Sequence, residues 1–258
     1  MTHQRCPWHE LKIDPVPVGR SLYVDAFGNP TVYFEIEGKH EALDVTARSF
    51  VEVLPTEPHD PGSTPPWERV RDACCEVKLT PGSDAGMYRF ASPMVPVGLE
   101  FGNFALPDFT PGRPVLEAAL ALTARIFHNF RFDPRATDVT TPVDEVLRKR
   151  AGVCQDFAHL NLALLRAMGI PSWYVSGYLH PSSDAEVDEV ITGESHAWVA
   201  AFTGSVWPLD PTSMHPVAER HVRVAAGRDY HDVAPFRGIY AGTATQQLEV
   251  TVEIARTA

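Results

Sequence analysis

The stretch Arg150–Leu160, RAGVCQDFAHL, decides the fold of this chain of 258 residues, because it places a cysteine at the start of a predicted helix. Apolar residues follow Cys154 at spacings of three and four, which is the pattern of one buried helix face. They are Phe157, Leu160, Leu164 and Met168. Gly169 is a typical helix stop, and Pro171 prevents the helix from resuming. The sequence therefore predicts a helix that begins near Cys154 and ends before Gly169.

The start of this helix is a favourable place for a nucleophilic cysteine. Unpaired backbone N–H groups and the positive end of the helix dipole favour an anion in the first turn. They therefore favour the thiolate of Cys154, which is the nucleophilic form of cysteine. Free cysteine is also among the residue types most often buried in protein cores. Position alone leaves a catalytic role and a packing role equally open.

Two later segments supply the partners that a cysteine nucleophile needs. His196 lies near the start of the strand-like segment 194–202, ESHAWVAAF, and Asp210 ends the next apolar run, VWPLD at 206–210. A thiol nucleophile requires a base to take its proton, and the base requires a third group to orient it. If the two segments form a hairpin that packs on the helix, the three side chains meet. The sequence thus predicts a triad of Cys154, His196 and Asp210.

The three motifs resemble those of the transglutaminase-like superfamily, and more narrowly its bacterial branch with a β-rich N-terminal region. The similar runs are GVCQDFA at 152–158, SHAWV at 195–199 and LDPT at 209–212, joined by DAFGN at 25–29 and GRDYHDVAP at 227–235. The resemblance implies that Cys154 is the nucleophile, that His196 is the general base and then acid, and that Asp210 orients His196. A departure is the short connection 203–205, which leaves the triad intact and puts the outer pocket wall in question.

The fold class that we expect is α+β, with two domains. Residues 1–108 are expected to form a β-rich N-terminal domain, with strand-like runs between 22 and 53 and a proline-rich connection at 55–66. Residues 109–258 are expected to form the catalytic domain. By resemblance this domain has a papain-like transglutaminase core, in which the helix bearing Cys154 packs on an antiparallel sheet.

Further residues near the triad are candidates for binding substrate. The side chain of Gln155 could donate to an oxyanion, although the backbone N–H of Cys154 is already placed for that task. Trp198 follows His196 by two residues and should share its side of the strand, either as a pocket wall or as core. Asp156 is expected to cap the helix. The acidic segment 182–193 is expected to be a solvated loop, and a sharper hypothesis makes it a lid that favours cationic amines.

Composition excludes several classes of function. Acidic residues outnumber basic ones by 33 to 22, so we expect no nucleic-acid partner. No apolar run reaches membrane-spanning length, and the first residues lack the features of a secretory leader. Four cysteines, two of them adjacent at Cys74 and Cys75, make a poor disulfide framework, so a cytoplasmic location is expected. No HExxH, P-loop, GxGxxG or GxSxG motif occurs, so we expect no metal and no cofactor.

The expected activity is acyl transfer through a thioester, with a peptide, protein or amide as substrate. Hydrolysis is favoured because the resemblance is to a bacterial branch of expected cysteine proteases. The first alternative is a cross-linking transglutaminase with an amine acceptor, since the same triad serves both reactions. The second is a non-catalytic binding module on the same fold. Metal binding by Cys154 and His196 would require further ligands, which the sequence does not identify. Oligomeric state cannot be inferred from these patterns.

Overall fold

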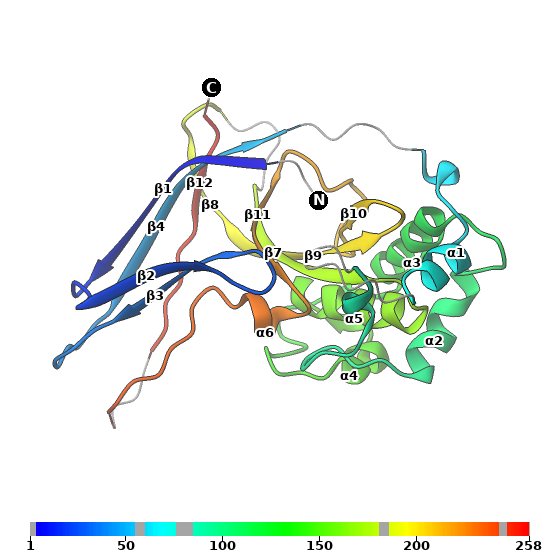
Figure 1. Cartoon of the computed structure of the whole chain (residues 1–258), viewed down its shortest axis with the longest axis horizontal. Helices are drawn as coiled ribbons and strands as arrows, with labels where there is room; N and C mark the ends of the chain where they lie inside the picture. The colour runs from blue at the N-terminus through cyan, green and yellow to red at the C-terminus, as the bar shows by residue number, and fades with distance from the viewer. Residues whose placement is uncertain (1–3, 55–59, 76–84, 181–185, 243–246, 258) are drawn as a thin grey trace.

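The computed structural model describes residues 4–54, 60–75, 85–180, 186–242 and 247–257. Its centre is a four-stranded antiparallel sheet with the strand order β10-β9-β7-β11. The strands are β7 (Ser172–Leu179), β9 (Glu194–Phe202), β10 (Val206–Leu209) and β11 (His221–Gly227). The helix α5 (Cys154–Ala167) packs against β9 and β7 of this sheet (Figure 1). The α+β class and the antiparallel sheet under the cysteine helix are thus as expected.

Strand β9 is apolar on both faces because both faces are covered. Side chains alternate between the two sides of a strand. Ala197, Val199 and Ala201 belong to the large core that includes α5, whereas Trp198 and Ala200 belong to a second cluster on the opposite face. The short connection 203–205 joins β9 to β10 in a tight hairpin, closed by a 2.7 Å hydrogen bond between Thr203 N–H and the Ser205 carbonyl. The sheet is therefore the buried middle layer of the core.

Four further helices pack in the same core as α5. They are α1 (Trp67–Ala73), α2 (Leu99–Ala105), α3 (Val115–Asn129) and α4 (Val143–Lys149). Short 3-10 helices lie at Pro61–Ser63, Ala85–Arg89 and Leu106–Asp108, and a short helix α6 lies at Tyr230–Val233. The helices α1 and α2 fall within the range assigned to the N-terminal domain, yet their apolar side chains pack in the same core as α3 and α5. The last strand described in the first 108 residues is β4, which ends at Val53.

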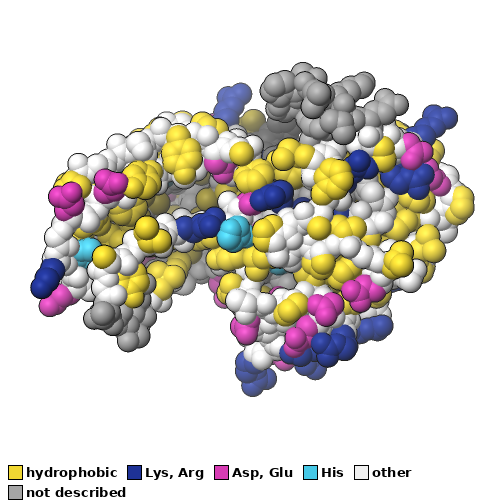
Figure 2. All heavy atoms as spheres, turned by 60° about the horizontal axis from the view of Figure 1, so that its bottom comes forward, with side chains coloured by type: hydrophobic (Ala, Val, Ile, Leu, Met, Phe, Trp, Pro, Cys, Tyr) yellow, Lys and Arg dark blue, Asp and Glu magenta, His cyan; other side chains and the backbone are white. Residues whose placement is uncertain are grey.

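Two-stranded β-ribbons extend to one side of this core (Figure 1). One ribbon pairs β1 (Gln4–Asp14) with β4 (Asp44–Val53), and another pairs β2 (Gly19–Val24) with β3 (Pro30–Glu35). Near the C-terminus, β12 (Glu253–Ala255) pairs with β8 (Val190–Thr192) beside these ribbons. In the view of Figure 2, acidic and basic side chains are interspersed over the surface. Among the described residues, no helix is long and apolar enough to cross a lipid bilayer.

Contacts and backbone conformation at its two ends explain where helix α5 begins and ends. The carboxylate of Asp156 accepts the N–H of Val153 at 2.8 Å, which is the capping role expected for it. At the other end Gly169 has φ +76°, a conformation that favours glycine, and Pro171 follows. Inside the helix, the buried His159 accepts the N–H of Tyr230 on its Nε2 at 3.1 Å. This hydrogen bond connects α5 to α6, the short helix that follows β11. Helix α5 is therefore attached to the sheet by its packing on β7 and β9 and also through α6.

Candidate active site

Cys154 is the first residue of α5 and is partly exposed at the helix end. It is preceded by the short strand β6 (Ala151–Gly152), which pairs in parallel with β5 (Arg131–Phe132). The first intrahelical hydrogen bond joins the Phe157 N–H to the Val153 carbonyl at 3.0 Å. The amides of residues 154–156 therefore have no acceptor inside the helix. This end of the helix can accommodate a negative charge on sulfur or on a nearby oxygen.

His196 and Asp210 form a buried hydrogen-bonded pair. The His196 Nε2 and Asp210 Oδ2 atoms are 2.8 Å apart, and the two side chains are 9% and 0% exposed. Burial alone would lower the pKa of His196, but the hydrogen bonds to Asp210 and Cys154 outweigh burial and raise this pKa to about 9. Because Nε2 is engaged with Asp210, Nδ1 is the ring nitrogen left for the thiol. The structure thus brings together the three residues that the sequence singled out.

Asp210 is held by more donors than the triad requires. Its Oδ1 accepts the backbone N–H of Thr212 at 2.8 Å and the Thr212 hydroxyl at 2.6 Å. Its Oδ2 accepts from His196 and also lies 3.4 Å from Nε2 of the buried His221. Burial raises the pKa of this carboxyl, but the hydrogen bonds outweigh burial and hold the pKa well below its usual range. Asp210 is therefore a fixed carboxylate at neutral pH.

Sequence reasoning missed His221, the first residue of β11. Its backbone N–H donates to the Ala218 carbonyl at 2.9 Å, and its Nδ1 accepts the Ala218 N–H at 3.3 Å. Since Nδ1 is an acceptor, the proton of the neutral ring is on Nε2, which makes His221 a donor to Asp210. The histidine lies at the head of a strand-like run, HVRVAAG, but nothing local shows that this run lies beside the triad.

Among the described residues, the donor atoms of His196, Asp210 and His221 lie within 4.8 Å of one another, a spacing that a metal ion could use. A metal ligand at Nε2 of His221 would require the proton on Nδ1, and Nδ1 already accepts an amide hydrogen. The arrangement is therefore better described as two imidazole donors that share one carboxylate.

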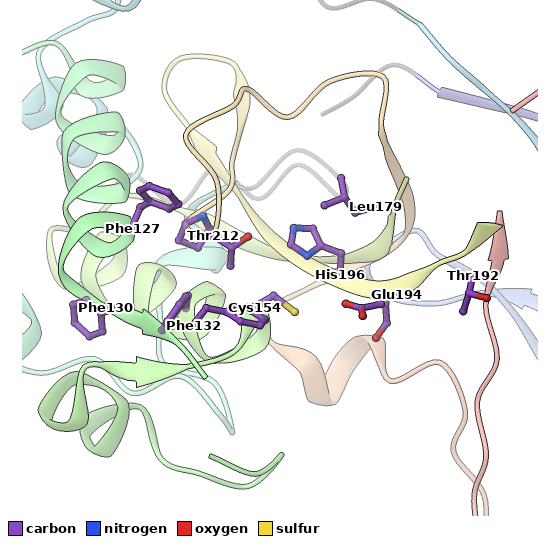
Figure 3. A pocket seen from close by; sticks show the side chains of 12 residues that line it. Phe127, Phe130, Phe132, Cys154, Leu179, Thr192, Glu194, His196 and Thr212 are labelled. Atoms are coloured by element: carbon purple, nitrogen blue, oxygen red, sulfur yellow. The ribbon is translucent and has the colours of Figure 1, made fainter. Parts of the chain in front are cut away.

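The triad opens into a pocket of about 480 Å³. One wall consists of phenylalanine rings, and the other comes from the ends of β7, β8 and β9, with Cys154 and His196 between them (Figure 3). The phenylalanine wall comprises Phe127, Phe130, Phe132 and Phe157. The opposite wall comprises Leu179, Thr192, Glu194 and Ser195, and Pro211 and Thr212 complete the lining. Cys154 is therefore reached through a concave and largely apolar site.

Gln155 and Trp198 are not among the described residues that line this pocket. The side-chain amide of Gln155 donates to the Val139 carbonyl at 3.2 Å. Trp198 is 1% exposed and shares the side of β9 with His196, the two rings being 6.0 Å apart and nearly parallel. Of the acidic segment 182–193, Asp184 lies outside the described residues, and Thr192 is the described member that lines the pocket.

Comparison with known proteins places the chain in a family. Residues 108–211 match the model of the transglutaminase-like superfamily core, and residues 1–52 match the bacterial transglutaminase-like N-terminal region. Uncharacterized proteins of Mycobacterium tuberculosis (strain ATCC 25618 / H37Rv) and Mycobacterium leprae (strain TN) are 38% and 36% identical to the chain. The alignments cover 97% and 96% of this chain and 82% and 86% of those proteins.

A solved structure has the same fold. It is a candidate cysteine protease from Cytophaga hutchinsonii, with a TM-score of 0.67 and 22% identity over 90% of this chain and 73% of that one. The matches to the two family models, with relatives 38% and 36% identical over nearly the whole chain, identify the chain as a member of the transglutaminase-like superfamily.

Proposed function

We propose that the protein is a cysteine-dependent hydrolase that cleaves peptide or amide bonds through a thioester intermediate. The observation that carries this proposal is the site geometry: Cys154 at the open end of α5, hydrogen-bonded to His196, which is bonded in turn to a buried Asp210. A nucleophile, a base in contact with it and an orienting carboxylate are the groups that acyl transfer requires.

The residues perform the reaction in two stages. The Cys154 thiolate attacks the carbonyl carbon, a C–S bond forms, and the oxygen gains a negative charge that the amides at the start of α5 can receive. When the C–N bond breaks, the His196 imidazolium gives its proton to the leaving amine, and a thioester remains. Water then attacks the thioester, His196 takes a proton from this water, and the C–S bond breaks to release the carboxylic acid.

The raised pKa of His196 suits the first stage. With a pKa of about 9, the ring is an imidazolium at neutral pH, so it can pair with a thiolate and has a proton to deliver. Asp210 orients the ring and offsets its charge in a buried site. A cytoplasmic location is part of this proposal, because the four cysteines are free and Cys154 must stay reduced.

Alkylation with iodoacetamide tests whether Cys154 is activated, and Cys6 is an internal control. Cys6 is exposed, whereas Cys154 is half-buried, so accessibility alone makes Cys6 react first. We expect Cys154 to react at least about tenfold faster than Cys6 at pH 7, and we expect His196→Ala to abolish the difference. Modified peptides are quantified by mass spectrometry. Equal or slower reaction at Cys154 would favour a non-catalytic binding module.

Release of p-nitrophenol from p-nitrophenyl acetate then measures acyl transfer, with Cys154→Ala as the inactive reference. The same reaction with added glycine ethyl ester separates the two acceptors. Hydrolysis predicts acetate as the main product, and an accumulation of acetylated amine would instead establish the cross-linking type of transfer.

A further inference from the structure

The phenylalanine wall of the pocket consists of two buried rings and two rings that are partly exposed to solvent. Phe130 and Phe157 are 6% and 2% exposed, and their rings meet edge to face with centroids 6.0 Å apart. Phe132 packs edge to face on Phe157 at 6.5 Å but is 55% exposed, and Phe127 is 37% exposed. The inner pair thus supports Phe132, and Phe132 and Phe127 both present apolar surface to water in the pocket that holds Cys154.

We propose that this wall binds an aromatic side chain on the acyl part of the substrate, the part that becomes the thioester. This inference rests on the proposed function, because it names the substrate class of the same site. Phe127 lies on α3, Phe132 on β5 and Phe157 on α5, the helix that carries Cys154. Phe130 and Phe157 belong to the same buried core as α3 and α5, so the wall is anchored in the core that also positions Cys154.

The direction of the reaction decides which part of the substrate meets the wall. The leaving amine takes its proton from His196, so it must lie on the side of the imidazole, which projects from β9. The acyl carbon stays on the sulfur of Cys154. The phenylalanine rings lie across Cys154 from Glu194 and Thr192 (Figure 3). The acyl side chain therefore extends toward the rings, and the amine extends toward the ends of β8 and β9.

Charge and shape select an aromatic group. Among the described residues that line the pocket, Glu194 is the one acidic side chain, Lys and Arg are absent, and the phenylalanine wall carries no polar side-chain atom. A charged acyl side chain would lose its water there without gaining a partner. An aromatic side chain would cover the exposed surfaces of Phe127 and Phe132 and could pack edge to face on these rings. A pocket of about 480 Å³ is within the size range of small-molecule sites.

The test uses irreversible probes that place a chosen side chain on the acyl side of Cys154. We compare N-acetyl-phenylalanyl, glycyl, lysyl and glutamyl chloromethyl ketones, with iodoacetamide as a reference that carries no side chain. The phenylalanyl probe should inactivate the protein at least about tenfold faster than the glycyl probe, since apolar pockets discriminate by about 10- to 200-fold. The lysyl and glutamyl probes should be no faster than the glycyl probe.

Single substitutions in the phenylalanine wall test whether this wall causes the preference for the phenylalanyl probe. Phe132→Ala, and independently Phe127→Ala, should lower the phenylalanyl-to-glycyl ratio at least fivefold, with both rates measured relative to the iodoacetamide rate of the same variant. Phe90→Ala is the matched control, because Phe90 is 56% exposed and lies outside the pocket lining. Its ratio should equal that of the wild type.

The outcomes separate this inference from the proposed function. A Cys154 that reacts with iodoacetamide but shows no aromatic preference, or a preference that survives both pocket variants, overturns the aromatic site and leaves the hydrolase proposal standing. A Cys154 that is inert toward iodoacetamide overturns both.

Discussion

Replacing Asp210 with asparagine should remove the charge that keeps His196 protonated and preserve the volume of the side chain. In the wild type the pKa of His196 is raised from 6.5 to about 9, a difference worth about 3 kcal/mol. Without the carboxylate, burial still lowers the pKa of His196 and only the contacts with Cys154 still raise it, so the pKa should fall from about 9 toward its ordinary value. The thiolate that pairs with this imidazolium should become less populated as a result.

The size of the effect depends on pH in a way that can be calculated. At pH 7.5 a histidine with a pKa of about 9 is about 97% protonated, whereas one with a pKa of 6.5 is about 9% protonated. At pH 5.5 both are more than about 90% protonated. Asp210→Asn should therefore slow alkylation of Cys154 by up to about tenfold at pH 7.5 and change it little at pH 5.5.

The assay is the second-order rate of iodoacetamide modification of Cys154 at the two pH values. Asp72→Asn is the control, because Asp72 is an exposed acid on α1 paired with Arg71, and it should leave both rates unchanged. An equal loss at both pH values would point to a general disturbance of the site, and no loss at pH 7.5 would refute the electrostatic reasoning outright.

Three further predictions follow from buried contacts. His221→Phe removes a donor to Asp210 and should slow alkylation of Cys154 severalfold, whereas His221→Gln keeps an N–H donor and should recover most of the rate; equal rates in the two variants would show that this donor has no role. Burial lowers the pKa of His159 to about 4, so the unfolded chain binds more protons between pH 6.5 and 4. The free energy of unfolding in urea should therefore fall by up to about 3 kcal/mol as the pH drops across that window, and His159→Gln should lose this dependence; parallel pH curves would contradict it. A Cβ on Gly177 would lie 2.1 Å from a β11 carbonyl and 2.6 Å from the β9 indole, so Gly177→Ala should destabilise the fold by at least about 2 kcal/mol, whereas Gly102→Ala, with 3.9 Å of room, should not.

Local sequence determined the cysteine helix and the hairpin beside it. Apolar spacing, the Asp156 cap and the Gly169 stop all act within the continuous segment 154–169, so the chain order alone places Cys154 in the first turn of α5. The segments that carry His196 and Asp210 are joined by three residues, and so short a connection allows little except a hairpin. The members of the triad could therefore be named before their distances were known.

Tertiary structure alone decided what surrounds the triad. His221 is the first residue of β11, and it lies near Asp210 only because β11 pairs with β7 in the sheet order β10-β9-β7-β11. No local sequence pattern encodes that order. Gln155 follows Cys154 directly, yet its side chain reaches Val139, because successive residues on a helix point in different directions. The phenylalanine wall joins α3, β5 and α5, which meet only when the core closes. A repeat of apolar residues predicts that one face of a helix or strand is buried, but it does not predict which other element covers that face. The pocket depends on which elements pack together.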